Sequence, residues 1–213
     1  MRAVRIGVLV SGGGSNLQAL LDAQARGELP GGEIAAVVAS RPDAYALTRA
    51  KEAGVPGFVV DRKQYESSRA MTVALVELLQ AQKIDLVILA GFLIILTEEL
   101  VEAYPNAVLN VHPALIPSFS GPGFYGLRVH RAVLDYGVKL TGATVHFATA
   151  DCDGGPIILQ KAVPVEEGDT PQSLQRRVME QAEWQLLPRA AALFCQGRLR
   201  VEGRAVRILP PRA

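Results

Sequence analysis

Asn110, His112 and Asp153 are the residues of this sequence best suited to acid–base and oxyanion chemistry. Only three histidines occur in the chain, so few side chains can exchange a proton near neutral pH. Asn110 and His112 lie two positions apart, and in a strand that spacing directs both side chains to the same side. An amide and a protonated imidazole can each donate a hydrogen bond to a developing oxyanion. The pair therefore predicts an oxyanion site; the alternative is a loop histidine that caps a strand.

Asp153 lies in a glycine-flanked loop, where aspartates often do no more than cap turns. If this loop folds back over the end of the strand that carries His112, the carboxylate should raise the pKa of the imidazole and keep it charged. The other two histidines have structural interpretations. His146 lies in an apolar strand pattern, as a core or sheet-edge residue, and His130 lies in a helix pattern, as a solvent-facing or structural residue.

Three consecutive glycines follow the first apolar run, within Ser11–Asn16. Where such a loop joins a strand to a helix, free backbone N–H groups and the positive end of the helix dipole can hold a phosphate. The alternative is a tight turn in which Ser15 or Asn16 caps the helix. Leu17 stands where a dinucleotide fingerprint that starts at Gly12 has its third glycine, and the loop lacks the lysine of a Walker motif. The loop therefore predicts a monophosphate-like ligand rather than NAD or ATP.

Short apolar runs alternate with segments of helical periodicity over the first two thirds of the chain. The runs lack the apolar/polar alternation of half-exposed strands, which favours a parallel sheet covered on both faces. The expected strands are Ile6–Val10, Ile34–Ala39, Gly57–Val60, Leu86–Ala90 and Ala107–Val111. The expected helices are Asn16–Arg26, Ala44–Ala53, Ser67–Lys83 and Thr97–Ala103. This order predicts an α/β fold, a doubly wound, mostly parallel sheet that binds ligands at the carboxyl ends of its strands.

The pattern then changes to two consecutive strands, Leu140–Ala148 and Pro156–Val165. Thr170 is a cap candidate before a proline, which predicts a long helix from Pro171 to about Phe194. The tail predicts a small hairpin or an irregular extension. We expect a single domain over residues 1–213, divided into a phosphate-binding half (1–105), a half with the candidate catalytic residues (106–195) and a short C-terminal extension (196–213).

The composition is that of an ordinary globular protein, since 49% of the 213 residues are hydrophobic and 20% are charged. The formal net charge is +1, so no general attraction to nucleic acid or to an anionic membrane is expected. The first apolar run is too short for a signal-peptide core or a membrane span, which makes the cytoplasm the expected compartment. Cys152 and Cys195 are expected to be reduced thiols, and no metal site is expected.

Four motifs, in this order, resemble those of phosphoribosylglycinamide formyltransferases, the folate-dependent enzymes of purine biosynthesis. They are Gly-Gly-Gly-Ser-Asn-Leu-Gln-Ala at 12–19, Leu-Ala-Gly-Phe at 89–92, Asn-Val-His-Pro-Ala-Leu-Ile-Pro at 110–117 and Asp-Gly-Gly-Pro-Ile-Ile at 153–158. The resemblance covers nearly the whole chain, and the motifs are highly specific in combination. It implies a Rossmann-like formyltransferase fold and transfer of a formyl group from 10-formyltetrahydrofolate, as co-substrate, to the amine of glycinamide ribonucleotide.

The resemblance also implies roles for the residues that match the family's motifs. The implied catalytic trio is Asn110, His112 and Asp153. The implied substrate contacts are Gly14, Ser15 and Asn16, at the phosphate, and Glu183 on the late helix. The implied folate contacts are Arg69, at the glutamate tail, Leu93, Ile94, Ile95, Leu96 and Asn110, and the closing loop of Thr149, Ala150, Asp151, Cys152 and Asp153. Small-molecule substrates are the expected partners, with a homodimer as a possible assembly and no nucleic acid or membrane.

Some features depart from the family pattern. Ile94 stands where the family often has arginine, and Trp184 stands where a histidine commonly follows the late glutamate. One extra residue lies between Arg177 and Pro188. The segment Phe119–Tyr125 is longer than the proline–glycine link expected there, and it is either a mobile lid or a different packing solution.

Other functions stay open on the sequence alone. A related formyl-folate enzyme would use the same core: formyltetrahydrofolate hydrolase, a sugar-nucleotide formyltransferase, or methionyl-tRNA formyltransferase, which usually carries a further domain. Outside enzymes, the alternative is a non-catalytic phosphometabolite-binding module. Release of tetrahydrofolate that depends on the amine would indicate a transferase. Release without the amine would indicate a hydrolase, and no release would indicate a binding module.

Overall fold

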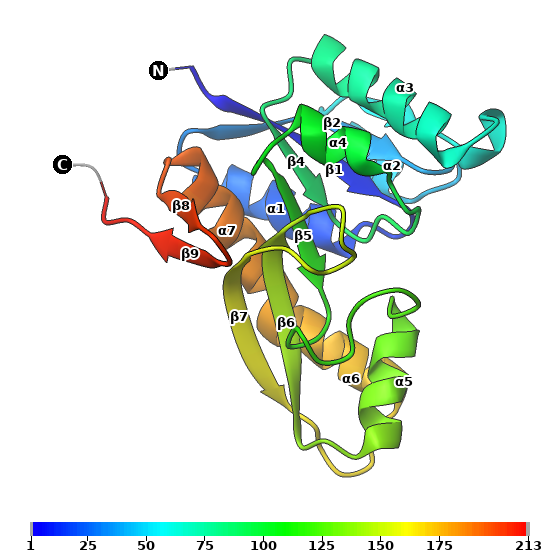
Figure 1. The fold of residues 1–213 in the computed structure, drawn as a ribbon, viewed down its shortest axis with the longest axis vertical. Coiled ribbons are helices and arrows are strands. Elements are labelled where there is room, and N and C mark those ends of the chain that lie inside the picture. Colours follow the sequence, from blue (N-terminus) through cyan, green and yellow to red (C-terminus); the bar gives the residue numbers. More distant parts are fainter. Residues whose placement is uncertain (1, 212–213) are drawn as a thin grey trace.

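A nine-stranded sheet with helices on both faces makes up the computed structural model, which describes residues 2–211 (Figure 1). The strand order is β3-β2-β1-β4-β5-β6-β7-β9-β8. The strands are β1 (Val4–Val10), β2 (Gly32–Ala39), β3 (Gly57–Val59), β4 (Leu86–Leu89), β5 (Val108–His112), β6 (Leu140–Phe147), β7 (Ile157–Pro164), β8 (Leu199–Glu202) and β9 (Ala205–Ile208). The helices are α1 (Ser15–Ala25), α2 (Ala46–Glu52), α3 (Ser68–Ala81), α4 (Glu98–Ala103), α5 (Leu127–Tyr136), α6 (Pro171–Val178) and α7 (Trp184–Cys195).

The doubly wound arrangement predicted from the apolar runs is confirmed. Strands β1 to β5 are parallel to one another; β1, β2, β4 and β5 have buried residues on both faces, whereas the edge strand β3 has none. Leu17 and Leu20 of α1 belong to the cluster on one face, whereas Leu75 and Leu79 of α3 belong to the cluster on the other. Because helices cover both faces, each parallel strand reads as an unbroken apolar run rather than an alternating one.

The order β1-β4-β5 brings three loops to one edge of the sheet. The glycine loop follows β1, the Gly91–Leu96 segment follows β4, and His112 ends β5. Neighbouring strands lie about 4.8 Å apart, so the end of β1 is roughly 10 Å from the end of β5. Ligands of open α/β sheets bind at this edge, and the fold therefore gathers the glycine loop and the candidate catalytic residues in one region.

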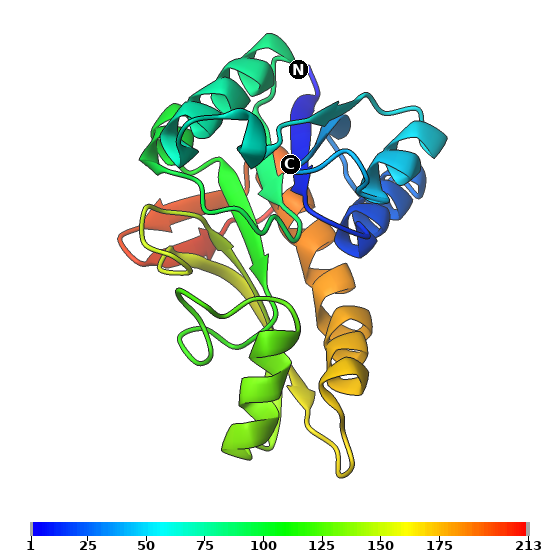
Figure 2. The same ribbon diagram turned by 90° about the vertical axis from the view of Figure 1, so that its right-hand side faces the viewer.

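The carboxyl-terminal half adds antiparallel strands and a long helical rod. β6 pairs antiparallel with both β5 and β7. The predicted long helix consists of α6, a π-helical turn (Met179–Glu183) and α7, which follow one another along the sheet (Figure 2). Thr170 caps its start with a capping box, and Pro171 is the first helical residue, as predicted. The tail is the predicted hairpin, β8 and β9, and β9 also pairs with β7.

Candidate active site

The glycine loop forms the turn from β1 into α1. Gly14 has a φ of 71°, and a Cβ atom placed on it would lie 2.7 Å from the Cβ atom of Ala46 in α2. This position therefore requires glycine, because the backbone is left-handed and α2 packs directly against it. Ser15 and Asn16 open α1, so their backbone N–H groups belong to the unpaired first turn. The loop thus has the geometry expected of a phosphate site.

Arg49 of α2 adds a positive charge to this loop, which the sequence pattern did not indicate. Its Nε donates to the carbonyl oxygen of Gly13 at 2.8 Å, and its Nη1 donates to Oε1 of Gln18 at 2.7 Å. Its guanidinium carbon lies 5.0 Å from the centre of the Tyr45 ring. Arg49 and Gly13 are 36 positions apart, so only the packing of α2 against the loop brings them together.

Glu183 and Asn16, both expected to contact the substrate, form a buried pair. Nδ2 of Asn16 donates to Oε2 of Glu183 at 2.7 Å. Glu183 ends the π-helical turn, and a turn of this kind takes up an additional residue within a helix. Glu183 faces Asn16 of α1 from the end of this turn. Burial raises the pKa of Glu183 to about 7, although the hydrogen bond from Asn16 acts in the opposite direction.

Replacing Glu183 with glutamine is expected to make the free energy of unfolding less dependent on pH. Burial raises the pKa of Glu183 from 4.5 to about 7 on folding, so between these values the folded state holds a proton that the unfolded state has lost. That stabilisation is fully present below pH 4.5 and disappears as the pH rises through 7. Between pH 5 and pH 8 the wild type should lose about 2 kcal/mol of stability through the ionisation of Glu183. The glutamine variant cannot ionise at this position and should not show that loss.

Urea unfolding of both proteins at the two pH values measures this difference. Glu180→Gln is a suitable control, because its carboxylate lies in the same turn, is 45% exposed and pairs with Arg176. The control should change the pH dependence little, since exposed pairs contribute little to stability. An equal pH dependence in Glu183→Gln and the wild type would show that Glu183 ionises normally.

Asn110, His112 and Asp153 converge at the carboxyl end of β5. Nδ1 of His112 lies 3.4 Å from Oδ2 of Asp153, and Nδ2 of Asn110 donates to Oδ1 of the same carboxylate at 3.3 Å. The side chains of His112 and Asp153 are 4% and 9% exposed, so this contact is shielded from water. The structure therefore brings together two polar groups of one strand and a carboxylate 43 positions beyond Asn110.

Two loops fix the Asp153 carboxylate over β5. A Cβ atom on Gly155 would collide with the carbonyl oxygen of Phe147, so only glycine lets the chain pass this close to β6. Asp153 itself has a φ of 54°, which aspartate adopts more readily than most residues. The backbone N–H of Gly121 donates to Oδ2 of Asp153 at 2.9 Å. The Phe119–Tyr125 segment therefore packs on the cluster instead of standing apart from it.

The His112 ring is held at both nitrogens, and its net pKa shift differs from the prediction. Nε2 lies 2.8 Å from the carbonyl oxygen of Phe119, and because a carbonyl only accepts, this contact places a proton on Nε2. Burial lowers the pKa of His112, and the charge of Asp153 raises it by less. Asp153 thus raises the pKa of His112 as predicted, but the net shift is downward, because burial of the ring has the larger effect.

Asp153 is the charged member of the cluster. Burial by itself would raise its pKa. Contacts with His146, the charge of His112 and the backbone N–H of Gly121 together outweigh burial and lower the pKa. The cluster thus contains a stable carboxylate beside an imidazole that resists protonation.

His146 belongs to the same cluster, although the sequence favoured a structural role. Its Nε2 lies 3.0 Å from Nδ2 of Asn110 and 3.6 Å from Oδ1 of Asp153. Its Nδ1 lies 2.9 Å from the carbonyl oxygen of Phe147, which places the ring proton on Nδ1 and leaves Nε2 to accept from Asn110. The antiparallel register of β5 and β6 pairs Asn110 directly with His146. His146 is therefore placed to orient the Asn110 amide.

His130 is fully buried in α5, so the solvent-facing interpretation is wrong and the structural one holds. Burial is the main reason that its pKa falls to about 4, and the nearby His112 adds to the effect. Within residues 2–211 neither ring nitrogen has a hydrogen-bond partner. His130 is thus a neutral core residue.

The segment between β4 and α4 presents apolar side chains to the same edge of the sheet. Leu93 and Ile95 are 60% and 80% exposed, whereas Ile94 and Leu96 pack against the core. The backbone N–H of Leu93 donates to Oγ of Ser11 at 2.8 Å, which ties the segment to the glycine loop. Two large exposed apolar groups beside candidate polar residues are typical of a surface that binds a ring-containing ligand.

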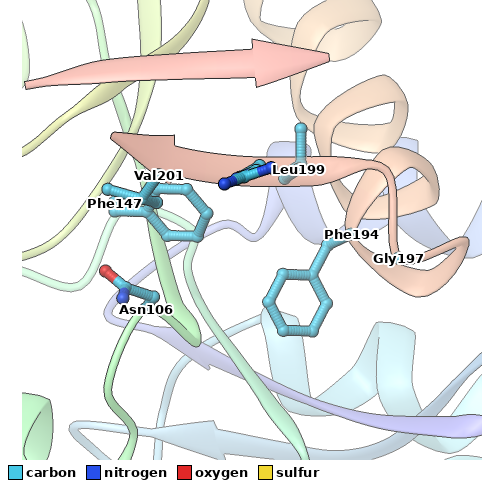
Figure 3. A pocket seen from close by; sticks show the side chains of 7 residues that line it. Asn106, Phe147, Phe194, Gly197, Leu199 and Val201 are labelled. Atoms are coloured by element: carbon cyan, nitrogen blue, oxygen red, sulfur yellow. The ribbon is translucent and has the colours of Figure 1, made fainter. Parts of the chain in front are cut away.

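An open hollow of about 390 Å³ lies elsewhere, between the end of α7, β8 and the start of β5 (Figure 3). Phe147, Phe194, Leu199 and Val201 line it. Phe147 follows His146 in β6, and successive strand residues point to opposite faces of a sheet. The hollow therefore lies behind the cluster of Asn110, His112 and Asp153 and is separate from it.

Three further observations concern the described part of the chain. No group of three or more His, Cys, Asp or Glu side chains in residues 2–211 is arranged to hold a metal ion. No helix in this range combines the length and apolar character needed to cross a bilayer. Cys152 and Cys195 are free thiols, and Cys152 adjoins Asp153 in the loop.

Comparisons with known proteins show which family this chain is similar to. Residues 4–191 match the family model described as formyl transferase. The phosphoribosylglycinamide formyltransferase of Haemophilus influenzae is 37% identical over 93% of this chain and 90% of that protein. The bovine trifunctional purine biosynthetic protein adenosine-3 is 41% identical over 94% of this chain, which spans 19% of that protein. The crystal structure of glycinamide ribonucleotide transformylase 1 from Symbiobacterium toebii has a TM-score of 0.92 and 48% identity, and the match covers 98% of this chain and 95% of that one.

Proposed function

Because the chain belongs to the formyl transferase family, we propose that it transfers the formyl group of 10-formyltetrahydrofolate to the amine of glycinamide ribonucleotide. The products are formylglycinamide ribonucleotide and tetrahydrofolate, in de novo purine biosynthesis. The main support is the convergence of Asn110, His112 and Asp153 at the end of β5, beside the phosphate loop. The expected cytoplasmic location and homodimer stay predictions.

The proposed reaction is a direct transfer without a covalent enzyme intermediate. The amine nitrogen attacks the formyl carbon and forms a tetrahedral oxyanion. Collapse of this intermediate breaks the bond between that carbon and N10 of the folate. The amine loses one proton and N10 gains one, so atoms and charge balance. Asn110 and His112 stabilise the oxyanion, Asp153 stabilises the imidazolium, and holding the two reactants together contributes a proximity effect.

Each proposed oxyanion donor is paired with a protein acceptor. Nε2 of His112 donates to the carbonyl oxygen of Phe119, and Nδ2 of Asn110 donates toward Nε2 of His146 and Oδ1 of Asp153. An oxyanion that binds either donor must replace one of these acceptors. Burial lowers the pKa of His112 and so disfavours the imidazolium, whereas a negative charge that develops beside the ring favours it.

The proposed nucleotide site extends from the glycine loop to β5. The phosphate binds the backbone N–H groups of Ser15 and Asn16, and the charge of Arg49 lies beside the loop. The gap of roughly 10 Å between the ends of β1 and β5 can hold the ribose and its glycinamide arm. Glu183, held by Asn16, is placed to accept a hydrogen bond from the substrate.

Replacing Gly14 with alanine is expected to raise the KM for glycinamide ribonucleotide about tenfold, which corresponds to about 1.4 kcal/mol of binding. The new Cβ atom would meet that of Ala46 at 2.7 Å, and the φ of 71° disfavours alanine, so the phosphate loop must move. Gly13→Ala is the matched control, because a Cβ atom there meets nothing within 4 Å. Steady-state kinetics of both variants measure the effect, and equal KM values would remove Gly14 from the phosphate site.

Incubation of the protein with 10-formyltetrahydrofolate, with and without glycinamide ribonucleotide, tests the proposed function. We expect tetrahydrofolate to be released only when the amine is present. Release without the amine would indicate a hydrolase, and absence of release would indicate a binding module. Transfer to an amino sugar nucleotide but not to glycinamide ribonucleotide would indicate a sugar-nucleotide formyltransferase.

A further inference from the structure

Arg69 and Glu99 form an ion pair between the start of α3 and the start of α4. Nε of Arg69 lies 2.5 Å from Oε1 of Glu99. The side chain of Arg69 is 74% exposed, whereas that of Glu99 is 16% exposed. An arginine that faces solvent is therefore attached, through its inner nitrogen, to a carboxylate that is mostly buried.

The Glu99 carboxylate is part of a rigid junction between the two helices. Oγ1 of Thr72, in α3, donates to the carbonyl oxygen of Ser68 at 2.9 Å and accepts from the backbone N–H of Thr97 at 3.2 Å. Leu100, next to Glu99, is buried in the same core cluster as Leu75 of α3. These contacts hold the start of α4 against α3, so the Glu99 carboxylate lies at a packed junction while Arg69 extends into solvent.

Glu99 is also kept ionised. The nearby Thr97 hydroxyl, the backbone N–H of Glu99 itself and the Arg69 guanidinium lower its pKa. Its second carboxylate oxygen, Oε2, is buried and has no hydrogen-bond partner within residues 2–211. A buried carboxylate oxygen without a partner is unfavourable, and the ion pair of the other oxygen with Arg69 offsets part of that cost.

The guanidinium group has a second edge that can bind another carboxylate. Glu99 contacts the Nε side of Arg69, and the Nη1 and Nη2 atoms form the outer edge of the same planar group. Arginine binds carboxylates most strongly through two parallel N–H···O bonds along one edge. A free arginine side chain loses rotamer entropy when it is fixed, so an arginine already held by Glu99 binds a carboxylate at lower entropic cost.

We propose that Glu99 positions Arg69 to receive a carboxylate of the glutamate tail of the formyl donor. The inference rests on the proposed function, because the proposed formyl donor carries a glutamate tail whose carboxylates an exposed guanidinium can bind. The position of Glu99 supports the proposal, because the segment Leu93–Leu96 leads directly into α4, the helix that carries Glu99. A donor whose ring system lies on the exposed Leu93 and Ile95 can extend its tail toward the junction of α3 and α4.

The charge of Glu99 makes the proposal easy to distinguish from a simpler one. If Glu99 merely repelled an anionic tail, its neutralisation in Glu99→Gln would tighten binding of the formyl donor. If Glu99 positions Arg69, the same substitution frees the guanidinium and weakens binding. The two explanations therefore predict effects of opposite sign from one variant.

The test compares two formyl donors, 10-formyltetrahydrofolate and 10-formyltetrahydropteroate, which lacks the glutamate. Glu99→Gln is expected to raise the KM for the first donor about tenfold and to leave kcat and the KM for the second unchanged. Arg69→Ala should give the same pattern. The double variant should be no worse than Arg69→Ala alone, because Glu99 acts through Arg69.

Glu98→Gln is the matched control, since it removes the same charge from the same helix turn at an exposed side chain. It should leave both KM values unchanged. The proposal would be overturned if Glu99→Gln bound the first donor more tightly or bound both donors equally more weakly. It would also be overturned if the effect of Glu99→Gln added to that of Arg69→Ala. If the wild type turns over neither donor, the proposed function itself fails, whereas normal wild-type turnover with an unaffected Glu99→Gln variant removes this inference alone.

Discussion

His112→Ala is expected to lower kcat by a factor on the order of 10²–10³, with little change in the KM of either substrate. The imidazole lies at the end of β5, 3.4 Å from the Asp153 carboxylate, where its Nε2–H can stabilise the tetrahedral oxyanion. This interaction strengthens only as charge develops, so its loss affects turnover more than binding. Asn110→Ala should have an effect of similar size for the same reason. Steady-state release of tetrahydrofolate measures both.

His130→Leu is a control for the loss of a buried histidine. His130 is fully buried, and its ring nitrogens have no partner within residues 2–211, so an apolar side chain of similar size should preserve kcat. Thermal unfolding of each variant separates loss of turnover from loss of structure. A folded His112→Ala or Asn110→Ala protein that keeps kcat within about threefold of the wild type would contradict the assigned role.

The parallel half of the fold could be predicted from the sequence because both faces of its strands are buried. The apolar runs Ile6–Val10 and Leu86–Ala90, for example, correspond to β1 and β4 within two residues at each end. The start of α6 could also be predicted, because Thr170 is a typical capping residue and a proline follows it. These features depend on residues that are close in sequence, and periodicity or a short motif is sufficient to indicate them.

Features that depend on strand register and depth of burial could not be predicted. The strand period predicts that Asn110 and His112 face the same side of the sheet. His146 joins them only because β6 pairs with β5 in one particular register. A shift of one residue would have turned His146 to the other face. The sign of the His112 pKa shift likewise follows from burial, which no local pattern reveals. The contacts of Arg49 with the glycine loop and of Arg69 with Glu99 arise from helix packing.

Asp153→Asn is expected to lower kcat by a factor on the order of 10²–10⁴, because the carboxylate is the group that joins the whole cluster. Its Oδ2 faces Nδ1 of His112 and accepts from the backbone N–H of Gly121 at 2.9 Å. Its Oδ1 accepts from Nδ2 of Asn110 at 3.3 Å. Asparagine has the same shape but only one acceptor oxygen, so its NH₂ group must face one of these donors.

The pH dependence of the Asp153→Asn variant separates the electrostatic role from a purely structural one. The charge of Asp153 raises the pKa of His112, against the larger opposing effect of burial. Removing that charge therefore lowers the pKa of His112 further, and a lower pH is needed to form the imidazolium. The limb of the kcat profile that reports protonated His112 should accordingly move to lower pH in the variant. Asp135→Asn, at an exposed position of α5, should leave the profile unchanged. A variant that loses activity equally at every pH would show that Asp153 holds the loops in place without sustaining the charge of His112.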